Sequence, residues 1–343
     1  PLIPIYLMSP SDDLQKYAVF ERYDSERKFP VQYWSANKLS MQNPFWIVNR
    51  NMFNTSKDRF LIGGSLSFDI TDWLDIQGPA RTDFNSTTAE QKNYASTNAL
   101  FAGEFGRYYY NNYKTTQTYA DVLANVHKTF GDNLIQLNAT LGASIEDYRF
   151  RSENIGGDLL GVANLFTFTN METGKEFYKN TYSDQTQSVF ATLQVGFKNY
   201  LFLDVTARND WSSAMASAKT GVISSFYPSV GLSAIITDMF TAKSDIIPYA
   251  KLRVSFAGVG NPVMRFILNP TYAVTGGVPA DQTWAVADNF RPEYTKSYEA
   301  GADIRMFKGK LAISGTVYYS QTSNQVFSPT ISGASTASTL YIN

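Results

Sequence analysis

Apolar and polar residues alternate with a period of two along much of the chain, in runs that come in pairs. The first pair runs from Asp58 to Ile70 and from Leu74 to Phe84, with the short polar turn Thr71-Asp72-Trp73 between them. Because successive side chains of a β-strand point to opposite faces, each run predicts a strand with one apolar face and one polar face. A short turn between two such runs predicts an antiparallel hairpin.

Four more pairs follow, so the pattern predicts about ten strands in five hairpins over residues 58–343. The later pairs are Thr116–Phe130 with Leu134–Tyr148, Val189–Phe197 with Leu201–Ala207, Phe226–Ile236 with Tyr249–Gly258, and Tyr294–Met306 with Leu311–Gln321. The stretches between hairpins are long and polar, with one loop predicted over 85–115. Residues 1–57 are rich in aromatic residues and proline and are predicted to form mainly one long extracellular loop.

The predicted strands are too long for an ordinary soluble sheet. Thr116–Phe130 and Leu134–Tyr148 alternate well beyond the 5–6 residues of a common strand. A strand that crosses a bilayer takes ~9–11 residues, and short turns at one end with long loops at the other are typical of outer-membrane barrels. An open sheet edge in hydrocarbon would leave backbone groups unpaired. We therefore predict an all-β fold, as part of an antiparallel transmembrane β-barrel in the bacterial outer membrane.

Composition agrees with a barrel, although by itself it leaves a soluble all-β protein open. The 343 residues include no Cys, which excludes disulfides and thiolate chemistry. The net charge of −1 gives no electrostatic basis for binding nucleic acid. Charged residues make up 17%, below the roughly 25% of soluble domains. No apolar run approaches the ~20 residues of a spanning helix.

Charged side chains gather on the polar face of the predicted strands. The set comprises Asp204, Arg208, Asp210, Lys251, Arg253, Glu299, Asp303 and Arg305. His127, the only His, shares the polar face of its strand with Asp121 and Asn125. We predict that these residues line the lumen, where they either meet the solute or brace the wall by salt bridges. A lone His without Cys predicts no metal site, no catalytic residue and no cofactor.

Aromatic residues fall into two predicted groups. Tyr108, Tyr109, Tyr110, Tyr113, Trp211 and Trp284 are expected in long loops. There they would either stack on the apolar faces of sugars, as candidate substrate-binding residues, or pack the loops together. A second group lies near the short turns and suits the aromatic girdle at a membrane interface. It comprises Phe68, Trp73, Phe130, Phe197, Tyr200 and Phe307.

Several blocks of sequence resemble the SusC/RagA family of TonB-linked outer-membrane transporters. The blocks are NPFWIVNRN at 43–51, LSFDITDWLDIQG at 66–78, VFATLQVGFKNYLFLDVTARNDWSS at 189–213, FYPSVGLSAIITD at 226–238, KLRVSFAGVGN at 251–261 and RPEYTKSYEAGADIRMFKGKLAISGTVYYSQTSNQVF at 291–327. They keep the order expected for the family and cover most of residues 43–343.

The resemblance implies a barrel of about 22 strands filled by a plug domain. It also implies energy from the TonB-ExbB-ExbD complex, a SusD-like surface lipoprotein that closes over the barrel, and an oligosaccharide or peptide as cargo. No plug or TonB box is recognisable in this sequence. In the family, the closing Leu340-Tyr341-Ile342-Asn343 motif leads into further strands. We therefore expect the chain to form the middle of a larger barrel.

The leading functional hypothesis is TonB-dependent uptake of a nutrient oligomer, with a glycan as the favoured cargo. The alternative is a receptor or adhesion barrel that binds ligand through its long loops without transporting it. An outer-membrane enzyme is a third class, but the chain has no Ser/His/Asp arrangement to support it. We therefore predict that the protein is not an enzyme.

Overall fold

The computed structural model describes the whole chain except Pro1 and residues 35–40, 173–175, 218–220, 242–243, 270, 273, 276, 282, 288–289, 333 and 336. Two compact units can be distinguished. The first contains Pro1–Leu61, Asp83–Gln117 and Tyr148–Ser183, and the second contains Ile62–Thr82, Thr118–Asp147 and Asp184–Asn343. Strands β3 to β7 each contribute residues to both units.

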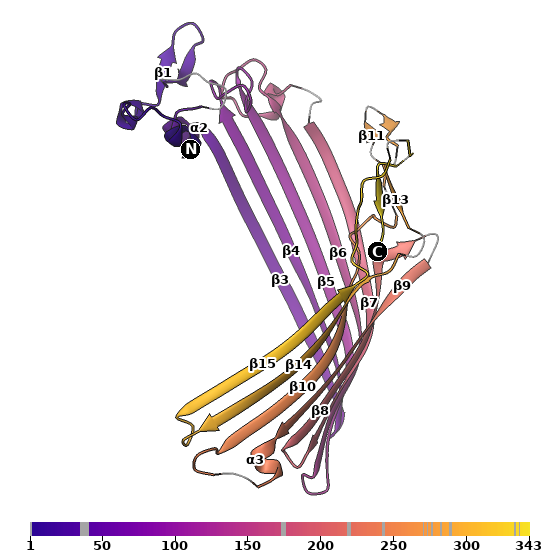
Figure 1. Cartoon of the computed structure of the whole chain (residues 1–343). Coiled ribbons are helices and arrows are strands. Elements are labelled where there is room, and N and C mark those ends of the chain that lie inside the picture. The colour runs from indigo at the N-terminus through magenta and orange to yellow at the C-terminus, as the bar shows by residue number, and fades with distance from the viewer. Residues whose placement is uncertain are drawn as a thin grey trace. The chain divides into compact units, whose positions relative to one another are not determined.

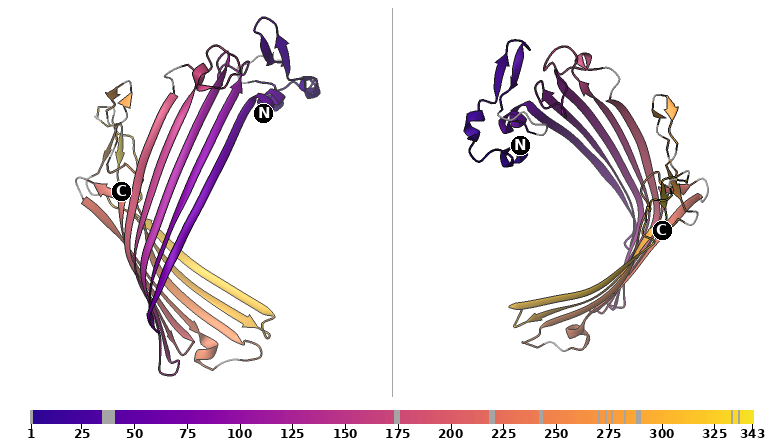
Figure 2. Two further views of the ribbon diagram at one scale, coloured as in Figure 1. Left: turned by 180° about the vertical axis from the view of Figure 1, so that it is seen from behind. Right: turned by 45° about the horizontal axis from the view of Figure 1, so that its top comes forward.

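Ten long strands form one sheet in which chain neighbours are also neighbours in space (Figures 1 and 2). They are β3 (Asn51–Thr71), β4 (Leu74–Tyr94), β5 (Gly106–Phe130), β6 (Ile135–Asp158), β7 (Glu176–Phe197), β8 (Leu201–Ser217), β9 (Gly221–Ile235), β10 (Tyr249–Asn261), β14 (Glu293–Met306) and β15 (Leu311–Ser323). Strands β7, β8, β9, β10, β14 and β15 pair with their neighbours in antiparallel registers. Among the described strands, β3 and β15 form the two edges, so these ten strands do not close a ring alone.

The five predicted strand pairs are present. Four of them are joined by short turns where the sequence placed them, whereas residues 236–248, which include α3 (Ile236–Met239), join the fourth pair. Lys198 and Asn199 have φ values of 48° and 58°, and the Tyr200 amide donates to the Phe197 carbonyl over 3.2 Å. Two consecutive positive φ values match the twist of antiparallel strands, and Asn adopts them more readily than most residues. Gly131, Asp132 and Asn133 also have positive φ in the second hairpin.

The strand ends away from these turns extend further than predicted. Strand β3 begins at Asn51 rather than at Asp58, and β4 continues to Tyr94 rather than ending at Phe84. The predicted loop over 85–115 is therefore wrong, since only residues 95–105 separate β4 from β5. Apolar alternation is needed only where a strand faces lipid. Backbone pairing continues past the apolar band with polar side chains on both faces.

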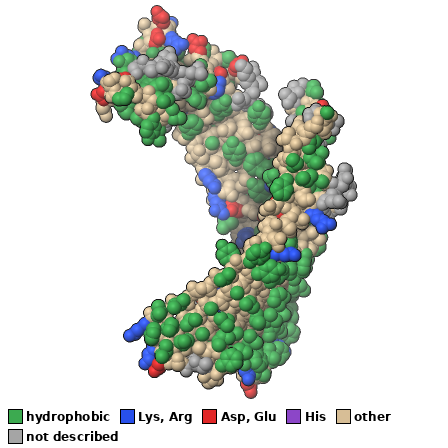
Figure 3. All heavy atoms as spheres, viewed as in Figure 1, with side chains coloured by type: hydrophobic (Ala, Val, Ile, Leu, Met, Phe, Trp, Pro, Cys, Tyr) green, Lys and Arg blue, Asp and Glu red, His purple; other side chains and the backbone are tan. Residues whose placement is uncertain are grey.

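The sheet exposes large apolar side chains instead of burying them. Leu66 is 84% exposed and Val317 is 76% exposed. In the second unit, hydrophobic side chains gather over β10, β14 and β15 and their neighbours (Figure 3). Such a surface would be unfavourable in water but matches the outward face of a barrel in lipid. Within the described parts of the chain, none of the helices combines the length and apolarity needed to cross a membrane.

The N-terminal segment has more regular structure than the predicted loop. It contains α1 (Leu2–Tyr6), the 3-10 helix η1 (Leu14–Tyr17), β1 (Glu21–Asp24) paired with β2 (Phe29–Gln32), and α2 (Pro44–Arg50). Asn43 caps α2 by accepting a hydrogen bond from the Phe45 amide, and Pro44 occupies the first turn, as helix starts favour. Trp46 is 1% exposed and donates to Thr97, which attaches α2 to the β4–β5 connection.

Buried apolar clusters lie where strand ends meet the connections, not along the middle of the strands. In the first unit, Tyr108, Leu159 and Met171 form one cluster, beside the short helix η2 (Phe168–Asn170). In the second unit, Met215 packs with Val263, Ile267 and Phe290. Because lipid surrounds the outer face and polar groups cover the other, the loops are where water-driven burial can hold the chain together.

The remaining short elements lie in the second unit. They are α3 (Ile236–Met239), β11 (Val274–Thr275), β12 (Val278–Pro279), β13 (Trp284–Val286) and β16 (Thr339–Tyr341). Strand β16 pairs in parallel with β13 and not with the ten-stranded sheet. The expectation that the Leu340-Tyr341-Ile342-Asn343 motif leads into further barrel strands stays a prediction.

Gly142 should be intolerant of larger residues. An added Cβ would meet the ring of Phe190 and lie 2.9 Å from Leu123 Cδ2, whereas Gly64 has nothing within 4 Å. We expect Gly142→Val in the full-length protein to lower stability by about 1–3 kcal/mol through overpacking. Gly64→Val should leave stability close to that of the wild type. Thermal unfolding in detergent, followed by circular dichroism, compares the two variants, and equal melting temperatures would contradict the packing argument.

Attachment of the 159–172 loop should weaken at alkaline pH. The Tyr108 hydroxyl donates to Glu90 over 2.7 Å, and its ring stacks on Phe168. Burial, and then this hydrogen bond, raise the pKa of Tyr108 above its ordinary value of 10.0. A raised pKa means that the stabilisation is complete below pH 10 and is lost as the pH rises further, because Tyr108 loses its proton at a lower pH when the loop is detached from it.

Limited proteolysis by subtilisin between pH 8 and pH 11 would measure this effect. Cleavage within 159–172 should accelerate above pH 10 in the wild type. Tyr108→Phe keeps the stacked ring but cannot ionise, so its cleavage rate should change less over the same range. An identical alkaline increase in both proteins would show that Tyr108 does not control the loop.

Candidate functional site

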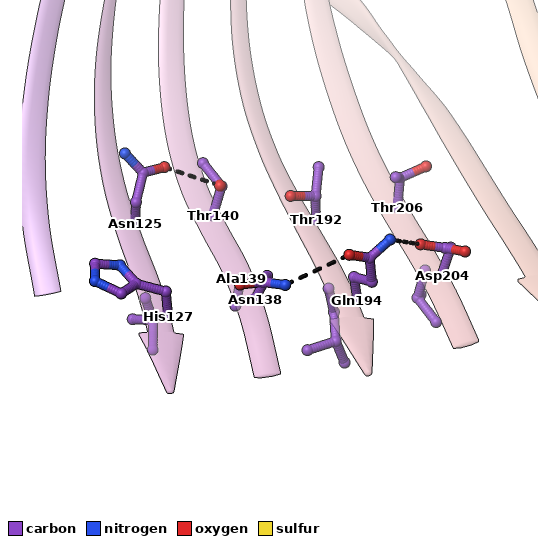
Figure 4. Close-up of a pocket in the computed structure, with 12 residues that line it drawn as sticks. Asn125, His127, Asn138, Ala139, Thr140, Thr192, Gln194, Asp204 and Thr206 are labelled. Atoms are coloured by element: carbon purple, nitrogen blue, oxygen red, sulfur yellow. Dashed lines mark hydrogen bonds between the residues drawn. The ribbon is translucent and has the colours of Figure 1, made fainter. Parts of the chain in front are cut away.

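A polar hollow of about 370 Å³ lies on the second unit and is lined by four adjacent strands, β5 to β8 (Figure 4). Its polar side chains are Asn125, His127, Asn138, Thr140, Thr192, Gln194, Asp204 and Thr206. Strand alternation brings them together, since each strand contributes residues two positions apart. The predicted polar face therefore exists as one continuous surface on these strands.

Hydrogen bonds connect these side chains from strand to strand. Asn138 donates to Gln194 over 3.4 Å, and Gln194 donates to Asp204 over 2.7 Å (Figure 4). Thr140 donates to Asn125 over 2.9 Å, and Asn125 in turn donates to Asp75 over 2.8 Å. Such ladders hold donors and acceptors in fixed positions on a surface that remains open. The hollow can therefore offer an array of hydrogen-bonding groups to a polar solute.

His127 belongs to this array and not to a reactive centre. Its Nδ1 lies 3.8 Å from Asp75 Oδ1, and its side chain is 56% exposed. Within the described residues, no group of three or more His, Asp or Glu side chains is placed to hold a metal ion. To act as a general base, His127 would need a positioned group whose proton it could accept, such as a nucleophile that it would activate. The geometry assigns His127 a place in the polar lining.

Four of the eight predicted charged residues form two ion pairs with one another. Arg208 donates to Asp210 over 2.7 Å and to Ser188, and Arg253 donates to Asp303. Arg305 lies over the ring of Tyr249, with 5.2 Å between its Cζ and the ring centroid. The contacts of Arg253 with Asp303 and of Arg305 with Tyr249 connect β10 to β14, whereas Arg208 and Asp210 lie on the same strand. Bracing of the wall by such pairs stays a prediction.

Glu299 is placed differently from the paired charges. It is exposed on β14 and lies between Ser255 and Tyr318 in the strand registers. Its carboxylate adds a negative charge to a row of hydroxyl-bearing residues on β15. The polar face of β14 therefore remains charged beyond the Arg253–Asp303 pair.

The aromatic residues predicted to be in loops are not in loops, with one exception. Tyr108, Tyr109 and Tyr110 lie on β5, and Trp211 lies on β8. Tyr108 is 5% exposed, with its ring against Phe166 and Phe168, so it cannot offer a free face to a sugar. The ring of Tyr109 covers Gly156, where even a Cβ would clash. Tyr110 contacts Phe168 edge-on with centroids 5.6 Å apart.

Trp211 and Trp284 take two further environments. Trp211 lies opposite Gln187 in the register of β7 and β8. Its side chain is on the same face of the sheet as that of Val189, which is the apolar face. A Trp in that position suits a membrane interface better than a sugar site. Trp284 is half-buried on the short strand β13. It therefore remains in the connection predicted for it.

The structure also contains a row of four aromatic side chains that the sequence did not predict. In the first unit, the rings of Phe150 and Tyr182 stack with centroids 4.7 Å apart, Tyr148 lies 6.2 Å from Tyr182, and Tyr113 lies 6.5 Å from Phe150. All four side chains are partly exposed. By strand alternation Tyr113 has the parity of Asn125 on β5, and Tyr182 has the parity of Gln194 on β7, so the row belongs to the polar face. Extending the alternation upstream of Thr116 would have indicated this parity, but not the cross-strand stacking.

Comparison with known proteins agrees with the geometry of the sheet in indicating a barrel. A model of the TonB dependent receptor-like β-barrel matches residues 6–343. TonB-dependent receptor P3 of Formosa agariphila is 23% identical over 306 residues, which are 84% of this chain and 29% of that protein. The chain therefore spans less than a third of this relative's length.

Solved structures show the same fold at low sequence identity. The RagAB peptide transporter aligns with a TM-score of 0.75 and 17% identity, over 91% of this chain and 35% of that one. The receptor FpvA of P. aeruginosa, bound to pyoverdines, aligns with a TM-score of 0.53 and 12% identity, over 94% and 40%. The predicted resemblance to SusC/RagA proteins and the predicted all-β partial barrel are both confirmed. TonB-dependent receptors are non-enzymatic outer-membrane proteins, and this chain belongs to their β-barrel family.

Proposed function

We propose that this chain forms part of the wall of a TonB-dependent importer that takes up a nutrient oligomer, with a glycan as its cargo. The observation that carries the proposal is the polar face of the sheet, which combines a hydrogen-bonding hollow with a row of partly exposed aromatic rings. A wall that only had to span the membrane would need neither feature. Both are the groups that recognise polyhydroxylated rings.

The aromatic row suits a sugar ring on physical grounds. The axial C–H groups of a pyranose form an apolar face that packs on an aromatic ring, while its hydroxyl groups need donors and acceptors. Phe150 and Tyr182 are stacked and pre-positioned, so binding would immobilise little that is not already ordered. Amide and carboxylate side chains such as Gln194 and Asp204 supply the complementary hydrogen bonds elsewhere on the polar face.

The chain supplies recognition and support in this proposal, and the driving force comes from other components. A plug domain inside the barrel would transmit the pull of the TonB-ExbB-ExbD complex, and a SusD-like surface lipoprotein would capture cargo over the extracellular loops. The long connections packed by Trp46 and by Tyr108 give such a lipoprotein an ordered surface to contact.

A peptide is the second candidate cargo, and the structural likeness to the RagAB peptide transporter favours it. Backbone amides of a peptide would use the same amide ladder, and aromatic side chains could stack on Phe150 and Tyr182. The two cargo classes differ in their dependence on charge, since a peptide carries terminal charges that a neutral glycan lacks.

Growth of a strain that lacks the whole gene would test import and identify the cargo class. On a panel of defined glycans and peptides as sole carbon sources, we expect loss of growth on one glycan and normal growth on peptides. Selective loss on peptides would support the second candidate. Unchanged growth on every substrate would count against import and favour a receptor that does not transport.

Variants of the aromatic row would test its role once a growth substrate is known. Tyr182→Ala and Phe150→Ala should each weaken binding of that oligomer to the full-length receptor about fivefold, as expected for loss of about 1 kcal/mol of ring stacking. Phe256→Ala is the matched control, because it removes one ring of the Phe256–Tyr298 pair on the apolar face. Equal affinities for all three variants would show that the row does not contact cargo.

A further inference from the structure

The connection that follows β10 folds back across neighbouring strands of the sheet. Strand β10 ends at Asn261, and Arg265, four residues further on, forms an ion pair with Asp184 on β7. Strands β9 and β8 lie between β10 and β7. Because neighbouring strands are ~4.8 Å apart, the chain covers roughly 14 Å sideways to reach β7. Residues 262–269, called the crossing segment below, therefore run across the sheet and not outward along the strand direction.

The ion pair lies on the polar face of the sheet. By strand alternation Asp184 shares a face with Ser188, which accepts a hydrogen bond from Arg208. Strand β7 begins at Glu176, eight residues before Asp184. Arg265 therefore reaches well inside the end of this strand, onto the face that carries the proposed cargo-binding groups.

The geometry of the ion pair is that of a strong contact. Arg265 donates to Asp184 Oδ2 from Nε over 2.6 Å and also from a terminal guanidinium nitrogen. The side chains of Arg265 and Asp184 are 34% and 21% exposed, so water screens the pair only in part. Two charged donors on one carboxylate fix the direction of the guanidinium as well as its position.

Apolar packing attaches the same segment to β8. Met215, near the end of β8, is fully buried against Val263 and Ile267. The Val263 amide donates to Met215 Sδ over 3.4 Å, and the Asn269 side chain donates to the Ala216 carbonyl. The crossing segment is thus held to β8 by packing and to β7 by charge.

The stretch after β15 supports the crossing segment from behind. Val326 and Tyr341 pack against the cluster around Met215, and β16 pairs with β13. The Asn343 side chain donates to the carbonyls of Arg291 and Asn324. Two connections therefore form one packed module, and Arg265 is its charged contact with β7.

We propose that the Arg265–Asp184 pair is a latch that keeps the crossing segment over the polar face as a fixed narrowing, which limits the size of solute that reaches the wall beyond it. The proposal rests on the proposed function, in which the polar face lines the route of the cargo. A loop that only joined β10 to β14 would need no charged contact with β7. The latch makes Arg265 a positioning residue that acts through the segment it holds.

Labelling of one engineered cysteine in the full-length receptor tests the latch. Val263 is 6% exposed, and the chain itself contributes no other thiol. Val263→Cys should react slowly with a small maleimide in detergent, because the thiol is reached only when the crossing segment detaches. Adding Arg265→Gln should raise that rate about tenfold, as expected when one charge-assisted contact is lost.

Two further variants separate the latch from a general loss of structure. Met264 is 68% exposed, so Met264→Cys should react fast with or without Arg265→Gln. Arg265→Glu should accelerate labelling of Val263→Cys more than Arg265→Gln does, because two carboxylates would repel each other. Adding Asp184→Lys to Arg265→Glu should slow labelling again, since the reversed charges can pair. Resistance of each variant to unfolding in sodium dodecyl sulfate before heating shows that the barrel is intact.

A second reporter measures the narrowing. Thr186 lies on β7, on the same face as Asp184 and two residues nearer the short turn. In intact cells, Thr186→Cys should react with a small maleimide but not with a polymer-linked maleimide. Adding Arg265→Gln should allow both reagents to react. Met264→Cys is the control, because both reagents should label it in either background.

Three results would overturn the proposal. The first is a labelling rate of Val263→Cys that Arg265→Gln leaves unchanged. The second is failure of Asp184→Lys to slow the labelling that Arg265→Glu accelerates. The third is reaction of Thr186→Cys with the polymer-linked maleimide while the latch is intact. None of these measurements depends on transport, so a receptor that imports nothing would contradict the proposed function without changing them.

Discussion

Pairing of backbone amide and carbonyl groups inside hydrocarbon is the constraint on which the rest of this structure depends. Lipid offers these groups no hydrogen-bonding partner, so each strand must be paired along its whole membrane-crossing length. The unbroken registers of β10 with β14 and of β14 with β15 satisfy this requirement. Once the ladder is fixed, strand alternation determines which side chains face lipid and which face the opposite side.

This constraint reverses the usual location of the core. Apolar side chains along the strands stay exposed because lipid takes the place that a protein interior has in a soluble domain. Burial of apolar groups away from water is then found where strand ends meet the connections, as in the clusters around Tyr108 and around Met215. The contact of Trp46 with Thr97 attaches the N-terminal segment to the β4–β5 connection.

The two faces of the sheet meet two different media, so they carry different kinds of side chain. The polar face carries hydrogen-bond ladders, ion pairs and partly exposed rings, which suit a hydrated cargo. The apolar face carries large exposed apolar side chains such as Leu66 and Val317, which suit lipid.

The sequence by itself determined the parts of this fold that local rules control. The turns at Lys198-Asn199 and Gly131-Asp132-Asn133 were predictable because positive φ values restrict residue choice within a few positions. The paired apolar runs were predictable because facing lipid requires an apolar residue at every second position. Thus the five hairpins, the polar parity of His127, Asp204 and Arg253, and the family resemblance could all be obtained without a structure.

Tertiary structure decided what depends on contacts between strands. Outside the bilayer, side chains need not alternate, so nothing local indicates that β4 continues to Tyr94 or that Trp211 remains on a strand. The burial of Tyr108 depends on the distant Phe166 and Phe168, and the stacking of Phe150 on Tyr182 depends on the register between β6 and β7. Sequence alternation gives the face of a side chain, but only the folded sheet gives its neighbours, because neighbours across a ladder are far apart in the chain.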